Sequence, residues 1–104
     1  MDPDRRGQVW LVDLGYVAKV RPCLVLSVPL TEADRALVTL VPHTTSPQGA
    51  RFETPSQERF LKTGVFDAQS LVTIPQAKLI RRLGSLPPDR LLQVEASVRS
   101  WLGL

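Results

Sequence analysis

An arginine that precedes a proline and an apolar run is the feature of this sequence best suited to chemistry. Arg21 and Pro22 lead into Cys23 to Leu26, a run with the length and composition of a strand buried on both faces. Pro22 suits the first residue of a strand because it has no N–H for the ladder, and it favours an extended backbone at Arg21. The guanidinium is therefore expected at the rim of a sheet, where it can hold an anion bidentately. A solvated charge at a strand end is the alternative.

A row of polar side chains, His43, Thr44 and Thr45, ends a second apolar run at residues 37–44. A threonine hydroxyl can donate a hydrogen bond to a phosphate, and capping of a turn is its alternative role. His43 is the only histidine, and imidazole has the ordinary pKa that suits proton transfer near neutral pH. Strand alternation puts His43 and Thr45 on one face and Thr44 on the other, so His43 and Thr44 cannot both line one site.

Metal and cofactor chemistry has little support in the sequence. One cysteine and one histidine cannot supply the three ligands of a catalytic zinc, and no glycine-rich phosphate loop is present. We therefore expect no metal and no cofactor. The single Cys23 cannot form an internal disulfide, which favours a reducing compartment, and its apolar neighbours indicate a core position.

Composition indicates an ordinary globular protein. The chain has 104 residues, 43% hydrophobic and 22% charged, and we expect one domain over residues 1–104. Its 13 Lys and Arg against 10 Asp and Glu give a net charge of +3, and most of the cations are arginines, which is compatible with recognition of phosphate or carboxylate. The polar residues 1–7 are not followed by the apolar h-region of a signal peptide, and no apolar run reaches membrane-spanning length, so a cytoplasmic location without membrane contact is expected.

Short apolar runs separated by proline, glycine and polar residues predict a mainly β protein. The expected strands are Val9–Leu14, which ends at Gly15, then 23–26, 37–44, 51–54, 64–66, 71–74 and 78–83, which Gly84 interrupts. Trp10 is expected in the core, and Pro42 at an edge or bulge. Between the second and third strands, Thr31 could cap a single helical turn. Residues 16–20 form a short first connection.

The C-terminal segment has helical periodicity. Leu91, Val94, Val98 and Trp101 recur at helical spacing, which predicts an apolar stripe that covers the sheet. Pro88 suits the first helical position, and Gly103 can end the helix. Glu95 and Arg99 are placed to pair at i,i+4. Many short strands followed by one helix predict a small, partly open barrel with the helix packed on it.

Several segments, in collinear order over nearly the whole chain, resemble the MazF/PemK/Kid toxins of toxin–antitoxin modules. The most specific is Arg21 to Ser27 (RPCLVLS), which resembles the family's RPVLVLS strand. The others are Arg6-Gly7 with Val9 to Leu14 (family RGDIWWVDL), Val41 to Ser46 (apolar-P-x-T-S), Asp67 to Gln69 (D/E-Q), and Lys78-Leu79 with Leu83-Gly84 (L…LG).

The resemblance implies an SH3-like, partly open barrel of the MazF/CcdB type with a C-terminal helix. Members of the family are homodimers that cleave single-stranded RNA at short sequences without a metal, and they leave a 2′,3′-cyclic phosphate and a 5′-OH. A cognate antitoxin blocks the site. By position the catalytic pair is Arg21 and Thr44, with His43 and Thr45 as possible supporting residues. The RNA-binding positions are Lys19, Ser46, Gln69 and Arg81.

Two segments depart from the family pattern. The first loop, Gly15 to Val20, is shorter than usual and lacks the segment that carries glycine and glutamate in some members. After Gln69, relatives read QIRT, whereas this chain reads Ser70-Leu71-Val72-Thr73 and so lacks an arginine that often lines the groove. Two other functions stay open: a CcdB-type toxin that poisons gyrase through its C-terminal helix, and a non-catalytic SH3-like module that binds nucleic acid or peptide.

Overall fold

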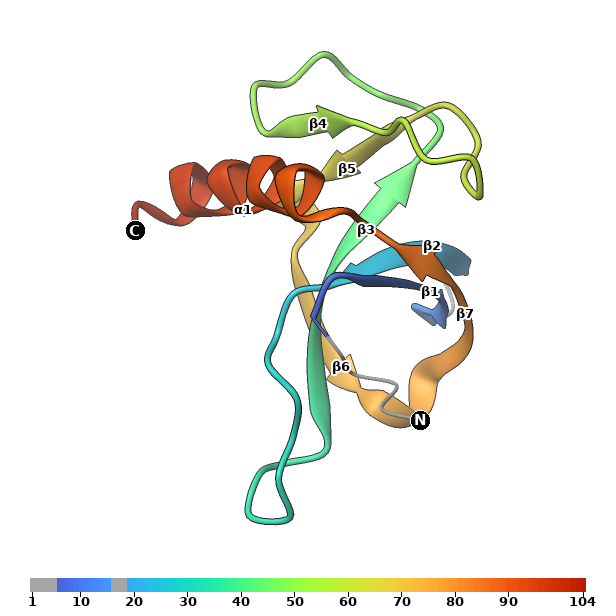
Figure 1. Cartoon of the computed structure of the whole chain (residues 1–104), viewed down its shortest axis with the longest axis vertical. Helices are drawn as coiled ribbons and strands as arrows, with labels where there is room; N and C mark the ends of the chain where they lie inside the picture. The colour runs from blue at the N-terminus through green and yellow to red at the C-terminus, as the bar shows by residue number, and fades with distance from the viewer. Residues whose placement is uncertain (1–5, 16–18) are drawn as a thin grey trace.

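The structure is a computed structural model that describes residues 6–15 and 19–104. Its elements, in chain order, are strands and one long helix, with two short 3-10 helices between the later strands (Figure 1). They are β1 Gln8–Asp13, β2 Val20–Val25, β3 Leu37–Thr44, β4 Glu53–Pro55, β5 Val65–Asp67, η1 Ala68–Ser70, β6 Val72–Pro75, η2 Gln76–Lys78, β7 Leu79–Ser85 and α1 Pro88–Leu102. Each predicted strand is present: the bounds of β3 are as predicted, and those of the other strands differ by one to three residues.

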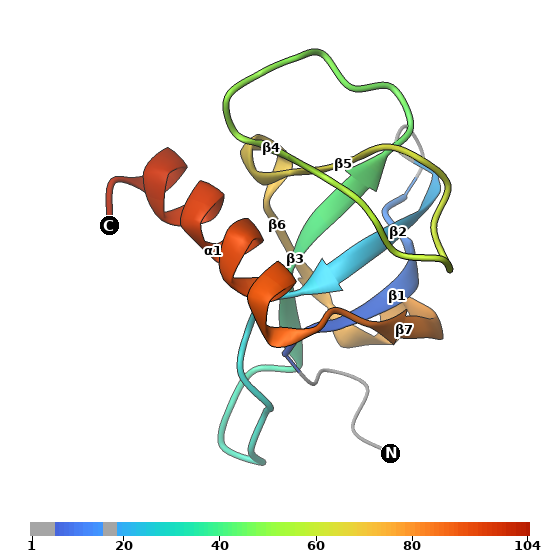
Figure 2. The same cartoon turned by 45° about the horizontal axis from the view of Figure 1, so that its top comes forward.

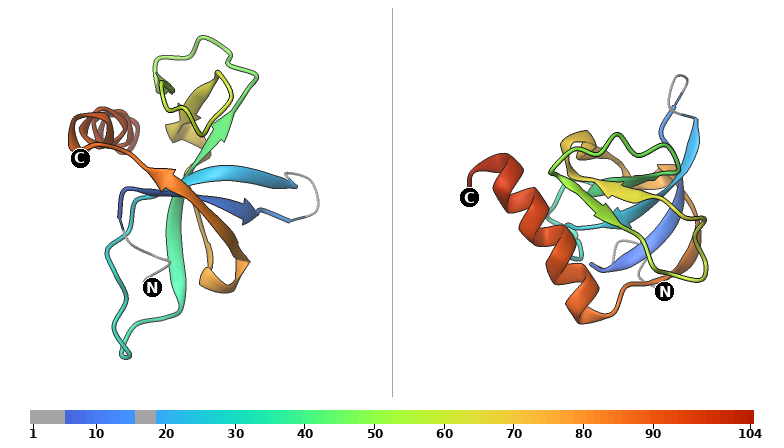
Figure 3. Two further views of the ribbon diagram at one scale, coloured as in Figure 1. Left: turned by 45° about the vertical axis from the view of Figure 1, so that its right-hand side comes forward. Right: turned by 90° about the horizontal axis from the view of Figure 1, so that it is seen from above.

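The seven strands form one antiparallel sheet in the order β4-β5-β3-β2-β1-β7, and β6 pairs with β3. Among the described residues β6 and β7 are not paired with each other, so the sheet curls without closing. Figure 3 shows this curl, with α1 lying along one side of the strands. The expectation of a mainly β, partly open barrel with a C-terminal helix is confirmed.

The third strand, β3, changes partner along one of its edges. Residues 37–40 of β3 pair with β6, whereas His43 and Thr44 pair with β5. Thr39 accepts a hydrogen bond through its carbonyl from the N–H of Leu26, so alternation turns the backbone of Pro42 to the other edge of β3. Pro42 therefore lies in the gap between the two partners, where the strand needs no N–H. The predicted edge position of Pro42 is therefore limited to this one point of β3, because the strand is paired on the same edge both before and after it.

Pro22 occupies an equivalent place on β2. It is the third residue of β2, not the first as predicted, and it pairs with Leu11 of β1. The Leu26 hydrogen bond shows that even-numbered residues of β2 turn their backbone towards β3. The ladder between β2 and β3 ends at Cys23 and Pro42, one residue before Pro22. Because Pro22 has no N–H to offer, β2 and β3 part at this point.

Two hydrophobic clusters occupy the two faces of the curled sheet. One contains Val9, Leu24 and Val41 with Val94 and Val98 of α1. The other contains Trp10, Val12, Cys23, Val25, Val38 and Leu40. In β2, Leu24 belongs to the first cluster and Cys23 and Val25 to the second, so this strand is buried on both faces, as predicted. The core position of Trp10 is confirmed, and its indole N–H donates to Gln8 Oε1 at 2.9 Å. Burial raises the pKa of the Cys23 thiol to about 12.

The helix α1 begins and ends as predicted. Pro88 is in its first turn, and Gly103 ends it in the left-handed conformation, with φ of 73°. Val94 and Val98 are buried, and Trp101 is tilted against the Phe52 ring with centroids 5.4 Å apart. Figure 2 shows α1 beside the sheet, with β7 leading into it. No helix among the described residues is long and apolar enough to cross a membrane.

Two charged residues of α1 differ from the sequence expectation. Glu95 pairs with Arg6, which precedes β1, and not with Arg99. Arg90 is not part of the predicted apolar stripe and is nevertheless buried, with its Nε 3.2 Å from Glu58 Oε2 and its Nη2 donating to the Pro55 carbonyl. Buried charge is tolerated only when it is paired and hydrogen-bonded, and these partners come from the end of β4 and from the segment after it. Arg90 therefore anchors that segment to α1.

Two local predictions were wrong. Residues 28–36 form no helix: Asp34 Oδ2 accepts from the Thr31 N–H at 2.9 Å within a hydrogen-bonded turn of the long β2–β3 connection (Figure 1). Gly84 does not end the last strand but pairs with Val9 inside β7. A Cβ at Gly84 would lie 2.5 Å from the Phe60 ring, so glycine is required for this close packing. The predictions for residues 1–5 and 16–18 lie outside the described residues.

Candidate active site

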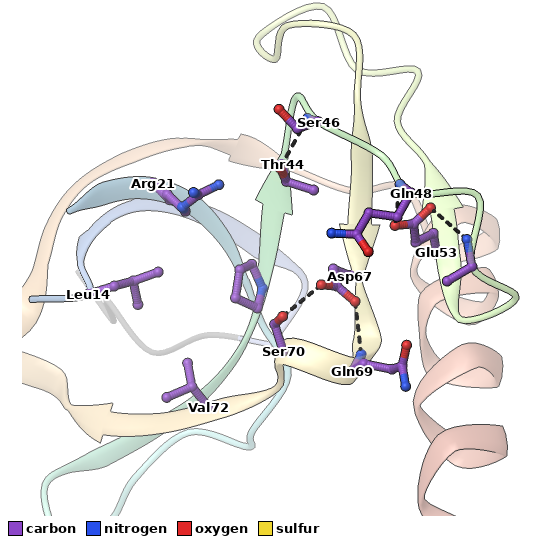
Figure 4. Close-up of a pocket in the computed structure, with 12 residues that line it drawn as sticks. Leu14, Arg21, Thr44, Ser46, Gln48, Glu53, Asp67, Gln69, Ser70 and Val72 are labelled. Atoms are coloured by element: carbon purple, nitrogen blue, oxygen red, sulfur yellow. Dashed lines mark hydrogen bonds between the residues drawn. The ribbon is translucent and has the colours of Figure 1, made fainter. Parts of the chain in front are cut away.

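A hollow of about 410 Å³ lies where β2 and β3 part. Its lining brings together residues from β2, the end of β3, the loop after β3 and η1 (Figure 4). Four residues singled out from the sequence line this hollow: Arg21, Thr44, Ser46 and Gln69. Two carboxylates, Glu53 and Asp67, line it as well. The hollow is therefore polar, with one cation facing two acids.

The strand register explains why Arg21 and Thr44 meet. Cys23 pairs with Pro42, and two residues further along the same register Arg21 falls opposite Thr44. Residues directly opposite in an antiparallel pair project from the same face. In Figure 4 the Arg21 side chain extends from β2 towards the end of β3, where Thr44 lies. Both side chains are partly exposed, so both are accessible from the hollow.

The Thr44 hydroxyl is held in place by the turn that follows it. Its Oγ1 accepts from the Ser46 N–H at 3.1 Å, so the turn-capping alternative for Thr44 is present in the structure. A hydroxyl that accepts through a lone pair still has its own O–H to donate. Capping and donation to a ligand are therefore compatible, and the cap fixes the oxygen at the rim of the hollow.

The two carboxylates hold the walls of the hollow. Glu53 accepts from three consecutive backbone N–H groups, of Gln48, Gly49 and Ala50, at 3.0, 2.9 and 3.2 Å. Asp67 accepts from the Gln69 N–H at 3.1 Å and from Ser70 Oγ at 2.7 Å. Sequence reasoning missed both roles. The Asp67 role could have been found, because an aspartate that accepts from the residue two further on is a common local turn motif.

A second hollow, of about 480 Å³, lies on the other face of β3. It contains the remaining residues that the sequence indicated, namely Lys19, His43, Thr45 and Arg81. Arg21 lines this hollow as well as the first. The structure thus divides the expected site residues between two hollows, and Arg21 is common to both.

His43 and Thr44 face opposite sides of β3, as alternation predicted. His43 is 2% exposed, its Nε2 is 3.0 Å from Ser56 Oγ, and its ring meets Phe66 edge-on at 5.3 Å. Burial lowers the pKa of His43 below its ordinary value of 6.5, and the charge of Glu58 only partly opposes this. His43 is therefore a neutral, packed side chain near neutral pH. Within residues 6–15 and 19–104 no three His, Cys, Asp or Glu side chains cluster as metal ligands.

The open antiparallel barrel with a C-terminal helix matches the fold of MazF toxins. The family model for the PemK-like, MazF-like toxin of type II toxin–antitoxin systems matches residues 5–102. The chain belongs to this family.

Solved structures with this fold include relatives at about a quarter identity. An endoribonuclease from a mycobacterial species, in complex with its cognate antitoxin, has a TM-score of 0.80 and 27% identity over 100% of this chain and 97% of that one. MazF from Deinococcus radiodurans has a TM-score of 0.81 and 26% identity, covering 100% and 99% of the two chains. The MazE–MazF complex from the same organism has a TM-score of 0.78 and 27% identity, covering 100% and 98%.

The buried His43 makes the stability of the protein depend on pH. Its folded-state pKa is lower than its unfolded value of 6.5, so below that pH the unfolded chain binds more protons and the folded state is destabilised. Urea unfolding at pH 7 and pH 5 should therefore show a smaller loss of stability for His43→Gln than for the wild type. Equal losses in the two proteins would contradict a depressed pKa at His43.

Proposed function

We propose that this protein is an endoribonuclease toxin that cleaves single-stranded RNA without a metal and at specific short sequences. The observation that carries the proposal is the meeting of Arg21 and Thr44 in one open hollow, in a chain of the MazF-like toxin family. A relative of 27% identity that matches the whole chain is an endoribonuclease. The hollow combines an anion-binding fork with a fixed hydroxyl, which suits a phosphodiester.

The reaction that fits these groups is attack of an RNA 2′-OH on the adjacent phosphate. The nucleophile is already next to its target, so the protein has to supply orientation and charge stabilisation. The 2′-oxygen bonds to phosphorus, the bond to the 5′-oxygen breaks, and the products are a 2′,3′-cyclic phosphate and a 5′-OH. We assign to the Arg21 guanidinium the stabilisation of the charge on the phosphoryl oxygens, and to Thr44 a hydrogen bond to the same phosphate. Arginine keeps its proton in proteins, so Arg21 is not assigned as the base.

The same hollow also bears on the two other functions that the sequence left open, a gyrase-poisoning toxin and a non-catalytic binding module. A gyrase-poisoning toxin of the CcdB type has no use for a phosphate fork beside a hydroxyl, so the position of Arg21 disfavours it. A non-catalytic nucleic-acid-binding module would use the fork without cleaving. Only an assay for cleavage distinguishes this module from an endoribonuclease.

The partners we propose are single-stranded RNA, a cognate antitoxin and a second copy of the chain. Two relatives, which this chain matches over 97% and 98% of their own chains, are in complex with an antitoxin, in one case MazE. A cytoplasmic location follows from an RNA substrate. The Ser46 and Gln69 side chains line the same hollow as Arg21, and we assign them to RNA binding there.

Cleavage should persist in EDTA and should require the arginine fork. The wild type should convert a long unstructured RNA to fragments with 5′-OH ends, while a duplex of the same sequence stays intact. Arg21→Lys should lose nearly as much activity as Arg21→Ala, because a point charge cannot replace two parallel hydrogen bonds. Strict dependence on a divalent ion, or full activity of the lysine variant, would exclude the proposed mechanism.

Substitutions of Thr44 and of His43 should have different effects on the kinetics of cleavage. Thr44→Val should lower the cleavage rate tenfold or more, which corresponds to about 1.4 kcal/mol or more for a hydrogen bond to a charged group. His43→Gln should leave the acid limb of the pH–rate profile in place, because His43 faces away from this hollow. Loss of that limb in His43→Gln, with Thr44→Val nearly unaffected, would instead indicate a histidine mechanism.

The protein should be a homodimer in solution. A single hollow of about 410 Å³ offers little contact to an RNA strand, and symmetric pairing is the commonest assembly of soluble chains. Light scattering at micromolar concentration should give twice the chain mass of 11.5 kDa. A monomer at that concentration would contradict this prediction.

A further inference from the structure

We propose that the second hollow, on the His43 side of β3, is a subsite for the RNA backbone beside the phosphate that is cleaved. Its cationic residues are Lys19, Lys62, Arg81 and the shared Arg21. The proposal rests on the proposed function, because the RNA that it would hold is the substrate of Arg21 and Thr44. We refer to this second hollow as the cationic hollow.

The charges of the two hollows differ sharply. Among the described residues, the cationic hollow is lined by four cations and by no aspartate or glutamate, whereas the first is lined by Arg21 and two carboxylates. The affinity of proteins for nucleic acid comes largely from cations that neutralise phosphates. The first hollow therefore offers little net attraction to a polyanion, and the cationic hollow supplies the charge that the first one lacks.

Arg21 connects the two hollows. It stands on β2 just beyond the last pair with β3, and it borders the Thr44 side and the His43 side of β3 at once. A strand whose scissile phosphate is bound at Arg21 can thus continue directly into the cationic hollow. Lys19 approaches from the first loop and Arg81 from β7, so cations from different elements converge on one path.

The backbone of Lys19 gives a separate reason to assign a role to its side chain. Lys19 has a φ of 58°, in the left-handed region that side chains other than glycine, asparagine and aspartate seldom adopt. Its N–H donates to the Gly15 carbonyl at 2.7 Å, and its carbonyl accepts from the Leu14 N–H at 2.9 Å, which fixes this conformation. Glycine would adopt it without strain. Lysine is strained at this position, and in the proposal the contribution of its charge to the cationic hollow offsets that strain.

Part of the apolar lining of the cationic hollow is closely packed against β7. Phe60 and Leu83 line it, and the Phe60 ring packs against Gly84 of β7. Lys62 follows on the segment that Arg90 anchors to α1 through its ion pair with Glu58. The cations are thus carried on a fixed surface, which suits the recognition of a backbone at a defined distance from Arg21.

The experiment measures binding of a non-cleavable single strand at several salt concentrations. The probe is a fluorescent 2′-O-methyl RNA of mixed sequence, which lacks the attacking 2′-OH, and the readout is anisotropy. Each of Lys19→Ala, Lys62→Ala and Arg81→Ala should lower the slope of log affinity against log salt by roughly 0.7, as expected for one single-strand phosphate contact. The triple variant should lose roughly three times as much.

Exposed cations outside the hollow serve as matched controls. Arg82 is the neighbour of Arg81 on β7, and Lys78 lies in η2. Arg82→Ala and Lys78→Ala should leave the salt slope unchanged. Equal losses in these controls would show a diffuse charge effect and would overturn the subsite.

Lys19→Gly tests strain and charge together. It should raise the melting temperature, because glycine relieves the left-handed backbone, and it should lower the salt slope as much as Lys19→Ala does. In cleavage assays the triple variant should raise KM several-fold and leave kcat within about twofold, as expected for lost uniform binding. A triple variant with the wild-type salt slope and KM would overturn the proposal. So would a triple variant that still binds the RNA probe normally and has lost only the ability to bind an acidic peptide.

Failure of the proposed function would give a different pattern. A wild type that binds the probe with the full salt slope but cleaves no RNA would leave the cationic hollow in place and remove the catalytic role of Arg21 and Thr44. A wild type that cleaves RNA while the triple variant binds and cleaves equally well would remove only the cationic hollow.

Discussion

The pairing of β2 with β3 ends beside Pro22, and the position of the candidate site depends on that ending. Pro22 has no N–H for β3, and Pro42 lies where β3 passes from β6 to β5. The strands part immediately beyond Cys23 and Pro42, while their register still places Arg21 opposite Thr44. Pro22 thus ends the ladder at a rim where, in the proposed function, a fork and a hydroxyl bind the same anion.

Loops surround this rim, and their conformations are stabilised by two carboxylates and by one buried arginine. Glu53 fixes the loop after β3 through three backbone N–H groups, and Asp67 fixes η1. Arg90 connects α1 to the segment after β4 by its ion pair with Glu58. Because removal of one partner of a buried pair leaves an uncompensated charge, the Arg90–Glu58 pair is costly to break. The two acids in the first hollow have a structural role of their own, which explains their presence near the proposed anion site.

The two hollows on either side of β3 differ in the charge of the residues that line them. The face with Thr44 offers a neutral donor beside Arg21, and the face with His43 offers the remaining cations. His43 itself is packed against Phe66 and kept neutral by burial, so it contributes shape and a hydrogen bond to Ser56. In the proposed function, chemistry and backbone affinity are placed on opposite faces of one strand, with Arg21 common to both.

The sequence by itself determined the features that depend on near neighbours. Apolar runs placed the strands, Pro88 and Gly103 placed the ends of α1, and alternation separated His43 from Thr44. The tertiary structure decided what depends on contacts between distant segments. It buried Arg90 against Glu58, enclosed Gly84 in β7 beneath Phe60, and divided Lys19 and Arg81 from Ser46 and Gln69. Periodicity reports which way a side chain points from its own strand, whereas the partner it meets is set by how the sheet curls.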